Sequence, residues 1–468
     1  MTLLNKFLLI FSFIIVFSSC AAQKQLKKTE DVLIFDDTDI NTNLIFDEEK
    51  PLEVDTTEIR IISTKPIKPD TITKTDSIIK IEPILELKSV YNVAIILPLM
   101  ADSVKSNWNR HYKTNLEDFN LPYASRQSLQ FIEGAMMALE NLELKSEFKI
   151  KIYDNSSSLE KTKTILSSIT SENTDLIIGP IQKQNISAVS EFAKKENILM
   201  LSPFSPSKSA SNNYSKYMMS NPSLDVHFLA MANYIRDSLS LCSIKILAPN
   251  NDKGKSYGKS IEAMFKSIND SLPANKKIKY ELLDMGSKTS DGRSFRLSEN
   301  LDANKRNILI IPSFNEGFVH NMFTNLSPIA KTYNITVFGM PNWKDSNTLR
   351  LEYFNKLNVH YTDSEWIDAE EESTQKFITE YKEKYKIIPE LNAFLGYDLF
   401  SFFPLLLDKY GLSLDKNIQK ETYKGMLNTY HFKPLNIDIE EENSENNRIE
   451  NTHLHIISFK EFKLNLEN

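Results

Sequence analysis

The segment closest to a chemical motif is Gly254 to Ser260, which reads Gly-Lys-Ser-Tyr-Gly-Lys-Ser. It follows an apolar run that predicts a strand, opens a predicted helix and ends in Gly-Lys-Ser, as a phosphate-binding loop does. Such a loop has four residues between its glycines, so that the backbone amides close around a phosphate. Only three residues separate Gly254 from Gly258. The spacing therefore argues against a nucleotide site.

The sequence also gives little indication of a metal site or of a catalytic nucleophile. His453 and His455 share one face of a predicted strand, but no third ligand lies nearby in the sequence. The two cysteines, Cys20 and Cys242, are too few for a four-cysteine zinc site or a disulfide framework. Cys242 opens an apolar strand, which indicates a buried, inert thiol. We therefore expect a protein that is not an enzyme, with no catalytic residues, no metal and no cofactor.

Composition sets the broad class. The chain has 468 residues, of which 41% are hydrophobic and 25% charged, as expected for one large or two medium globular domains. The formal net charge of −7 gives no electrostatic reason to expect a nucleic-acid partner. There are only 11 glycines, and none precedes Gly134, which leaves little material for glycine-rich loops.

Near the start of the chain, Lys6 precedes an apolar run from Phe7 to Phe17, which is too short to cross a bilayer, and Ser18-Ser19-Cys20 follows. This pattern resembles a bacterial lipoprotein signal. The resemblance implies a signal peptide over residues 1–19, lipidation of Cys20 and anchoring to a lipid membrane. Because no aspartate follows Cys20, the resemblance favours an anchor in the outer membrane, with the protein facing the periplasm. The alternative is an ordinary secretory signal with a chance cysteine.

Residues 20–90 are interpreted as the lipid anchor followed by a disordered tether. They contain four prolines and no glycine among Thr, Lys, Asp and Glu, and so bury little core. One repeat stands out within them, because Leu33–Asp37 reads Leu-Ile-Phe-Asp-Asp and Leu44–Glu48 reads Leu-Ile-Phe-Asp-Glu. These segments are either two short strands or a chance repeat, or else a docking motif for a partner.

From residue 91 the pattern alternates between strands and helices. The run Val93–Leu97 is continuously apolar, which is typical of a strand buried on both faces, and similar runs recur at 150–152, 176–178, 198–200, 244–248, 308–311 and 336–338. Apolar residues at helical spacing lie between them, for example Leu129, Ile132, Met136 and Leu139. This order predicts a parallel α/β architecture, with ligands beyond the carboxyl ends of the strands.

Several short segments follow one another in a recognisable order, namely Val93–Pro98, Phe131–Ala135, Ile152–Asn155, Asp175–Pro180, Ile198–Pro203, Ile246–Pro249 with Tyr257-Gly258, Val337–Gly339, and Phe377 to Asp398. This order resembles that of the leucine-binding-protein type of periplasmic solute receptor. The resemblance implies the type 1 periplasmic-binding fold, in which two doubly wound parallel-sheet lobes are joined by a three-strand hinge. We expect residues 91–220 with 340–428 to form one lobe, and 221–339 with 429–468 the other.

Candidate ligand contacts lie at the predicted strand ends and in the long segment between Met100 and Tyr123. They are Asn107, Trp108, Arg110, Lys183, Gln184, Asn185, Phe204, Ser205, Asn250, Lys255, Ser313 and Asn315. Amino-acid receptors of the family offer Ser or Thr hydroxyls after the third strand, whereas Gly179 to Asn185 has none. A free amino acid is therefore not the expected ligand.

Two functions follow from the resemblance. The first is a membrane-anchored lipoprotein that binds a small solute in an interlobe cleft, for an ABC-type transporter or for sensing. The second is an envelope regulator that contacts a peptidoglycan synthase through the same fold, because the chain also partly resembles the outer-membrane lipoproteins that activate such enzymes. The partner is accordingly a small molecule or an envelope protein.

Overall fold

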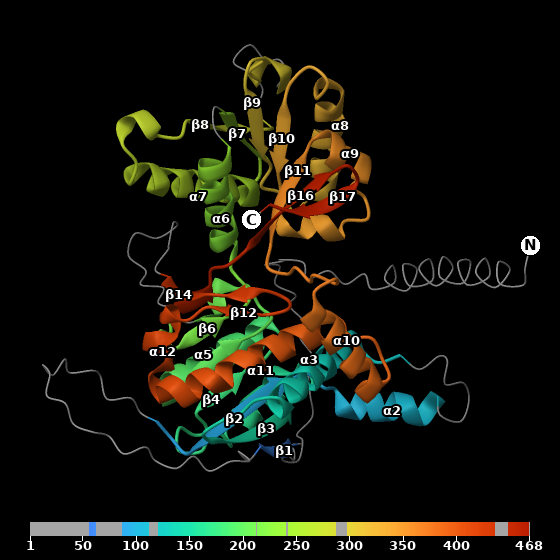
Figure 1. The fold of residues 1–468 in the computed structure, drawn as a ribbon, viewed down its shortest axis with the longest axis vertical. Helices are drawn as coiled ribbons and strands as arrows, with labels where there is room; N and C mark the ends of the chain where they lie inside the picture. The colour runs from blue at the N-terminus through green and yellow to red at the C-terminus, as the bar shows by residue number, and fades with distance from the viewer. Residues whose placement is uncertain are drawn as a thin grey trace, which may run out of the picture. The chain divides into compact units, whose positions relative to one another are not determined.

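The structure is a computed structural model that describes residues 56–61, 87–111, 120–211, 213–239, 242–286, 297–435 and 448–467. These residues build two large sheets with helices on their faces (Figure 1). The predicted signal peptide, Cys20 and the two Leu-Ile-Phe-Asp segments lie outside the described residues. Within the described ranges, no helix is both long and apolar enough to cross a membrane.

The first sheet has eight strands and reverses its order at β2, which β3 and β4 flank. From β3 to β15 all neighbours are parallel, whereas β1 and β14 pair antiparallel at the two edges. The order is β1 (Thr56–Ile61), β3 (Glu147–Asp154), β2 (Val90–Leu97), β4 (Leu176–Ile178), β5 (Leu199–Ser202), β6 (Tyr217–Met219), β15 (Arg448–Asn451) and β14 (Phe432–Leu435). The predicted central strand, Val93 to Leu97, is buried on both faces.

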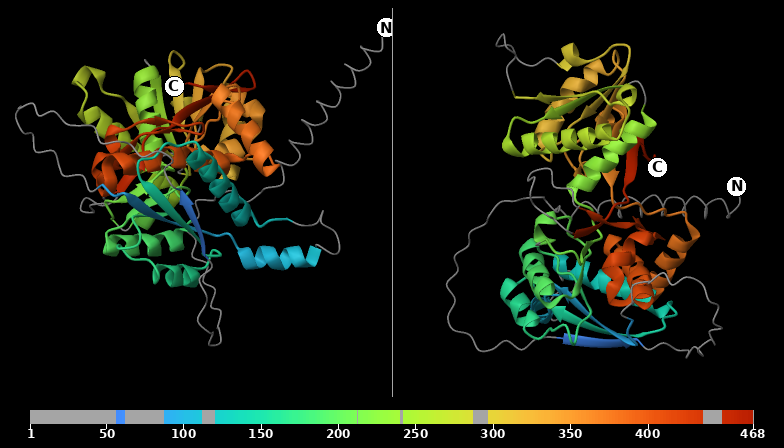
Figure 2. Two further views of the ribbon diagram at one scale, coloured as in Figure 1. Left: turned by 60° about the horizontal axis from the view of Figure 1, so that its bottom comes forward. Right: turned by 90° about the vertical axis from the view of Figure 1, so that its left-hand side faces the viewer.

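Helices cover both faces of this sheet (Figure 2). Helices α3 (Tyr123–Glu140) and α11 (Leu391–Tyr410) pack on one face, and α4 (Leu159–Leu166) and α5 (Lys183–Glu196) lie on the other. Helix α10 (Glu372–Tyr385) packs outside α3 and α11 through an aromatic cluster around Phe377 and Tyr381. The apolar residues from Phe394 to Leu407 are largely core, and α11 continues through Pro404 without a break.

The second sheet has seven strands and reverses its order at β7. Its strands from β8 to β11 are parallel, and β16 and β17 add an antiparallel edge. The order is β17 (Lys463–Leu466), β16 (His455–Lys460), β11 (Val359–Asp363), β10 (Ile335–Phe338), β9 (Arg306–Ile310), β7 (Cys242–Ala248) and β8 (Tyr280–Asp284). The flanking helices are α6 (Leu224–Ser238), α7 (Asp252–Asp270), α8 (Glu316–Ile329) and α9 (Leu351–Lys356).

The strands are divided between the lobes differently from the sequence prediction. Strand β11, within residues 340–428, extends the second sheet, and strands β14 and β15, beyond residue 428, extend the first. The chain therefore passes between the sheets after β6, after β11 and after β15. The difference arises because β11 and β15 carry polar and charged residues and lack the apolar run by which the other strands were recognised.

Part of the predicted tether is also ordered. Residues Thr56–Ile61 form β1 and pair antiparallel with β3, from Thr56 opposite Tyr153 to Ile61 opposite Phe148. These six residues are thus an edge strand within the segment interpreted as a tether, and their Glu-Ile-Arg-Ile alternation is typical of one. The other residues between 20 and 86 lie outside the described part of the chain.

Candidate functional site

The turn after β4 carries three of the predicted contact residues. Gly179 has φ +90°, and a Cβ there would lie 2.3 Å from the Ile96 carbonyl oxygen, so only glycine fits. Lys183 and Gln184 are exposed at the start of α5. Asn185 is fully buried instead, and its amide donates to Gln182 Oε1 at 3.4 Å. The turn thus presents Lys183 and Gln184, while Asn185 points into the lobe.

The turn after β5 is more closed than the sequence predicted. Phe204 is 5% exposed, and its ring packs 5.1 Å from that of Phe131 in the core between the sheet and α3. Ser205 is half-buried, and its hydroxyl accepts a hydrogen bond from the Ser207 amide at 3.2 Å. Phe204 is therefore a core side chain, and the Ser205 hydroxyl is hydrogen-bonded within its own turn.

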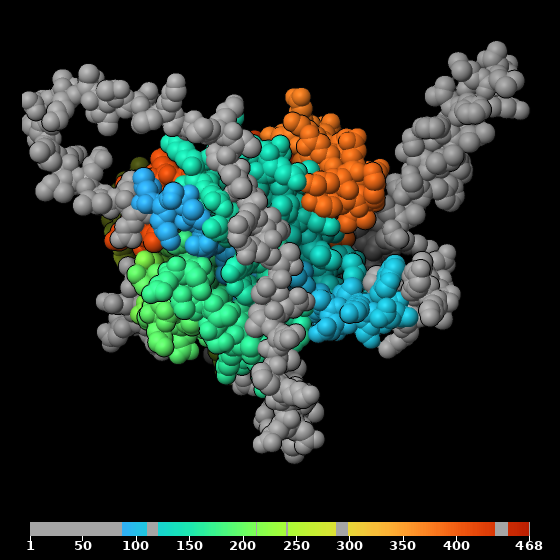
Figure 3. Space-filling model, turned by 90° about the horizontal axis from the view of Figure 1, so that it is seen from below, coloured from blue at the N-terminus to red at the C-terminus, as the bar shows by residue number. Residues whose placement is uncertain are grey.

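Asn107, Trp108 and Arg110, which lie in the long segment between Met100 and Tyr123, are part of a helix. Helix α2 (Ala101–His111) follows β2, and the Asp154 carboxylate accepts the amides of Met100 and Ala101 at 3.0 and 2.8 Å, which fixes its start. The helix extends outward from the first lobe (Figure 3). Trp108 is 43% exposed on it, whereas the Arg110 side chain lies outside what the structure describes.

In the second lobe, Asn250 and Lys255 lie near the end of β7. Both are exposed, and Lys255 Nζ is 3.8 Å from Asp284 Oδ2 at the end of the neighbouring strand β8. The α7 N-terminus is already capped, because Asn251 Oδ1 accepts the Gly254 amide at 2.8 Å. The Gly-Lys-Ser segment lies inside this helix, so it forms no loop of free amides for a phosphate.

Ser313 and Asn315 follow β9, but both serve the local backbone. Ser313 is 4% exposed, and its carbonyl oxygen accepts a hydrogen bond from Trp343 Nε1 at 3.0 Å. Asn315 is the N-cap of α8, where its side chain accepts the Phe318 amide at 2.8 Å. Both residues follow a strand, as expected, but the hydrogen bonds that they make stabilise the turn between β9 and α8.

The sequence interpretation missed a charged cluster at the ends of β10 and β11. Lys344 Nζ lies 2.8 Å from Asp363 Oδ2 and 3.2 Å from Glu365 Oε2. Burial raises the pKa of Asp363, although the nearby Lys344 ammonium acts against this shift. Burial lowers the pKa of Lys344, but Asp363 and Glu365 outweigh it and raise the value overall. Asp363 ends β11 and Ser364-Glu365 directly follow it, so recognising that strand would have identified the cluster.

Comparisons with known proteins agree with this architecture. The model of the receptor family ligand binding region matches residues 136–325. A putative branched-chain amino acid ABC transporter protein from Rhodospirillum rubrum aligns with a TM-score of 0.53 and 14% identity, over 81% of this chain and 99% of its own. An ABC transporter substrate-binding protein from Desulfitobacterium hafniense aligns with a TM-score of 0.50 and 12% identity, over 81% and 99%.

The chain has the type 1 periplasmic-binding fold. The lipoprotein LpoA of Haemophilus influenzae is also similar, with a TM-score of 0.48 and 12% identity over 82% of this chain and 59% of its own. No curated protein sequence matches the chain.

The first and third crossovers of this type 1 periplasmic-binding fold meet in a buried charged cluster. Arg448 is fully buried, with its Nε bonded to Glu450 and its Nη2 3.8 Å from Asp225. Glu450 Oε2 accepts the Ser223 amide at 2.9 Å, and Lys208 lies 3.0 Å from Asp225. These contacts tie β15 to the start of α6 and so position the hinge strands.

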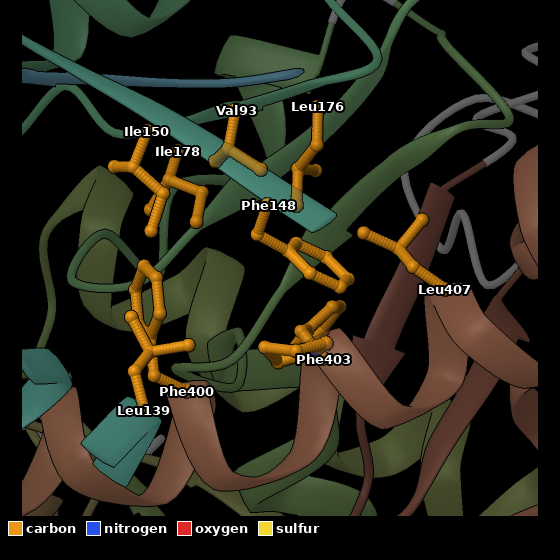
Figure 4. Close-up of a pocket in the computed structure, with 10 residues that line it drawn as sticks. Val93, Leu139, Phe148, Ile150, Leu176, Ile178, Phe400, Phe403 and Leu407 are labelled. Atoms are coloured by element: carbon orange, nitrogen blue, oxygen red, sulfur yellow. The ribbon is translucent and has the colours of Figure 1, made fainter. Parts of the chain in front are cut away.

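A void inside the first lobe is part of its core (Figure 4). Its volume is about 10 Å³, which is at the lower limit for a single water. Every lining side chain is apolar, and these are Val93, Leu139, Phe148, Ile150, Leu176, Ile178, Phe400, Phe403, Pro404 and Leu407. The void therefore holds no polar ligand.

The described residues contain no group of three or more His, Cys, Asp or Glu side chains arranged to hold a metal. His453 and His455 stack edge to face at 5.0 Å, and burial lowers the pKa of both imidazoles. The half-buried Cys242 thiol donates to the Leu239 carbonyl oxygen at 3.4 Å, and burial raises its pKa. A raised pKa makes Cys242 a poor nucleophile.

Proposed function

We propose that this chain is a lipid-anchored, non-catalytic binding protein of the bacterial envelope that holds a small solute between its two lobes. The observation that carries the proposal is the pair of order reversals, at β2 in one sheet and at β7 in the other. Ligands of open α/β sheets bind beyond the carboxyl ends of the strands at such a reversal. The similarity to an ABC transporter substrate-binding protein and to a putative branched-chain amino acid ABC transporter supports the same class.

Exposed polar side chains at these strand ends suggest the chemistry of the solute. Lys183 and Gln184 lie at the start of α5, and Asn250 and Lys255 follow β7. Gln182, the α5 N-cap, makes no capping bond with its side chain, which instead donates to Ser157 Oγ at 2.9 Å. Ammonium and amide groups suit an anionic or strongly polar solute. The lack of hydroxyls from Gly179 to Asn185 argues against a free amino acid.

Thermal-shift measurements on the full chain test this proposal with amino acids, sugars and muropeptides as separate panels. A solute at a hundred times its Kd should stabilise the fold by about 2.7 kcal/mol and raise Tm by a few degrees. The double substitution Lys183→Ala with Gln184→Ala should abolish the shift. Lys195→Ala, at the exposed far end of α5, is the matched control and should keep it. If no panel shifts Tm, the solute-binding proposal fails.

The proposed anchor needs its own test. Mass spectrometry of the mature amino-terminal peptide should find Cys20 acylated and residues 1–19 removed, with the protein in the outer-membrane fraction. Cys20→Ala should move the protein out of that fraction, whereas Cys242→Ala should not. Unmodified Cys20 in the mature protein would contradict the anchor without affecting the solute-binding test.

A second function, contact with a peptidoglycan synthase, is favoured by one feature of the first lobe. Helix α2 extends from the lobe and carries Trp108, 43% exposed, and Tyr123 at the start of α3 is 44% exposed. Exposed aromatic side chains are enriched in protein interfaces. A photo-cross-linking residue at position 108 should then capture a synthase in cells, while one at Ile388, which is 67% exposed, should not. Equal capture at both positions would count against this function.

A further inference from the structure

The last strand of the second sheet has an unusual surface. All four residues of β17 are exposed, and three apolar side chains stand on or beside it, with Phe462 62%, Leu464 50% and Leu466 41% exposed. Strand β17 ends the sheet order, and no strand of the described ranges pairs with its outer side. Open edges with apolar side chains invite pairing with another strand, and proteins usually protect them. The exposed β17 edge therefore requires an explanation.

The hairpin geometry shows which main-chain groups of β17 face outward. Glu461 and Phe462 have φ of 52° and 60°, as in a two-residue type I′ turn, which Lys460 and Lys463 close as a hydrogen-bonded pair. Hydrogen-bonded pairs alternate along an antiparallel ladder, so Asn465 also bonds to β16. The Glu467 amide, which donates to the Ile456 carbonyl at 2.9 Å, fits this alternation. Leu464 and Leu466 therefore direct their N–H and C=O groups to the open edge.

This edge is complementary to itself. When two copies of β17 run antiparallel with Asn465 on the two-fold axis, Leu464 of each copy faces Leu466 of the other. The outward groups then make four main-chain hydrogen bonds, and both apolar pairs are matched. In the same register Lys463 stands opposite Glu467. Moving the axis to Leu464 or Leu466 loses this charge pairing, and an axis at Leu464 also brings the turn residue Phe462 opposite the strand.

We propose that the β17 edge pairs with the β17 edge of a second copy of this chain in an isologous, two-fold dimer. A four-residue strand buries less than the roughly 1,000 Å² typical of stable interfaces, so the dimer is weak and exchanges readily. Two copies on one membrane would have a high effective concentration, which favours such a contact. The proposal does not depend on the identity of the solute.

Disulfide trapping in the full chain tests the register. Asn465→Cys places two thiols on the axis, where Cα atoms of such a non-hydrogen-bonded pair lie about 4.5 Å apart, within disulfide range. Lys463→Cys is the matched control, because its two copies would lie about 13 Å apart along the strands. Both variants carry Cys242→Ser and are oxidised in detergent, then compared with the Cys242→Ser parent. We expect at least fivefold more disulfide dimer from Asn465→Cys than from Lys463→Cys.

A proline distinguishes strand pairing from collision. Leu466→Pro removes only an outward N–H donor, so the β16–β17 pairing survives while two of the four bonds between copies are lost. Added to Asn465→Cys, it should reduce the dimer yield at least fivefold without shifting Tm. Equal yields from Asn465→Cys and Lys463→Cys, or a monomer at every concentration in sedimentation with no trapped dimer, would overturn the proposal. Full trapping in the presence of Leu466→Pro would overturn it as well.

Discussion

Lys344 Nζ lies 2.8 Å from Asp363 Oδ2, so one ammonium group joins the turn after β10 to the end of β11. Asp363 is the last residue of β11, from which the chain passes to the first lobe. The side chain of Asp363 is 8% exposed and that of Lys344 27%. The ion pair therefore fixes one of the three crossovers from within the second lobe.

Replacing Lys344 by Met should destabilise the fold, because it leaves the Asp363 carboxylate buried without its cation. Removing one partner of a fully buried pair costs 3–5 kcal/mol, and the partial exposure of Lys344 reduces the expected loss to about 2 kcal/mol. Asp363→Asn in the same chain should recover at least half of that loss, because the amide carries no charge. Urea denaturation gives both values. A double variant no more stable than Lys344→Met would exclude this electrostatic explanation.

Gly134 and Gly396 lie where α3 and α11 cross. A Cβ on Gly134 would come within 1.9 Å of the Ala393 carbonyl oxygen, and one on Gly396 within 2.0 Å of that of Phe131. Both neighbouring atoms belong to the main chain, so Gly134→Ala or Gly396→Ala must push the helices apart. We expect either substitution to lower the free energy of unfolding by about 2 kcal/mol or more. Gly317→Ala, in the exposed first turn of α8, should change stability by less than about 0.5 kcal/mol. Thermal melts that rank the three variants equally would contradict the close packing.

The sequence predicted the central strands well, because strands buried on both faces must be apolar throughout. It missed β11 and β15 because these strands carry polar side chains that are nevertheless buried. His360 in β11 is buried, yet it stacks on Phe338 at 5.0 Å and bonds to the Asn358 carbonyl. Arg448 and Glu450 in β15 are buried because they pair with each other. The residues that allow these polar side chains to be buried are either distant in the sequence, as Phe338 is, or on the same strand, as Glu450 is. A hydropathy pattern does not reveal such contacts.

The sequence predicted that the candidate residues follow strands, but it did not predict the direction of their side chains. A residue after a parallel strand lies at the edge of the sheet, and Lys183, Gln184, Asn250 and Lys255 are indeed exposed there. Phe204 and Ser313 occupy equivalent places but turn inward, toward Phe131 and the turn before α8. Whether a turn residue faces solvent depends on the packing of the following helix, which the sequence pattern does not specify.

Strand β1 predicts slow amide exchange within the segment that composition suggests is a tether. Its pairing with β3 over Thr56–Ile61 hydrogen-bonds alternate amides. We expect peptides covering these residues to exchange at least tenfold more slowly than the same sequence as a free peptide. A chain in which Ile59 and Arg60 are both replaced by Pro should lose this protection, because one of two consecutive amides must bond to β3. Exchange at the free-peptide rate in the native chain would contradict the strand.

His227 predicts a loss of stability in mild acid. It is buried on α6 with Nδ1 2.7 Å from Thr362 Oγ1, and burial, aided by the Lys344 charge, lowers its pKa from 6.5 to about 3. Below pH 6.5 the unfolded chain binds a proton that the folded chain excludes, so stability falls as the pH drops toward 3. At pH 5 the loss from His227 is about 2 kcal/mol relative to pH 7. Burial raises the pKa of Asp398 to about 7, so protonation of Asp398 stabilises the fold as the pH falls from 7 to 5. This contribution is the same in the native chain and in a His227 variant, and it cancels when the two are compared. His227→Gln should therefore lose about 2 kcal/mol less than the native chain between pH 7 and pH 5 in urea denaturation, even if it is less stable at pH 7. Identical losses in the two chains would show that His227 becomes protonated in the folded state.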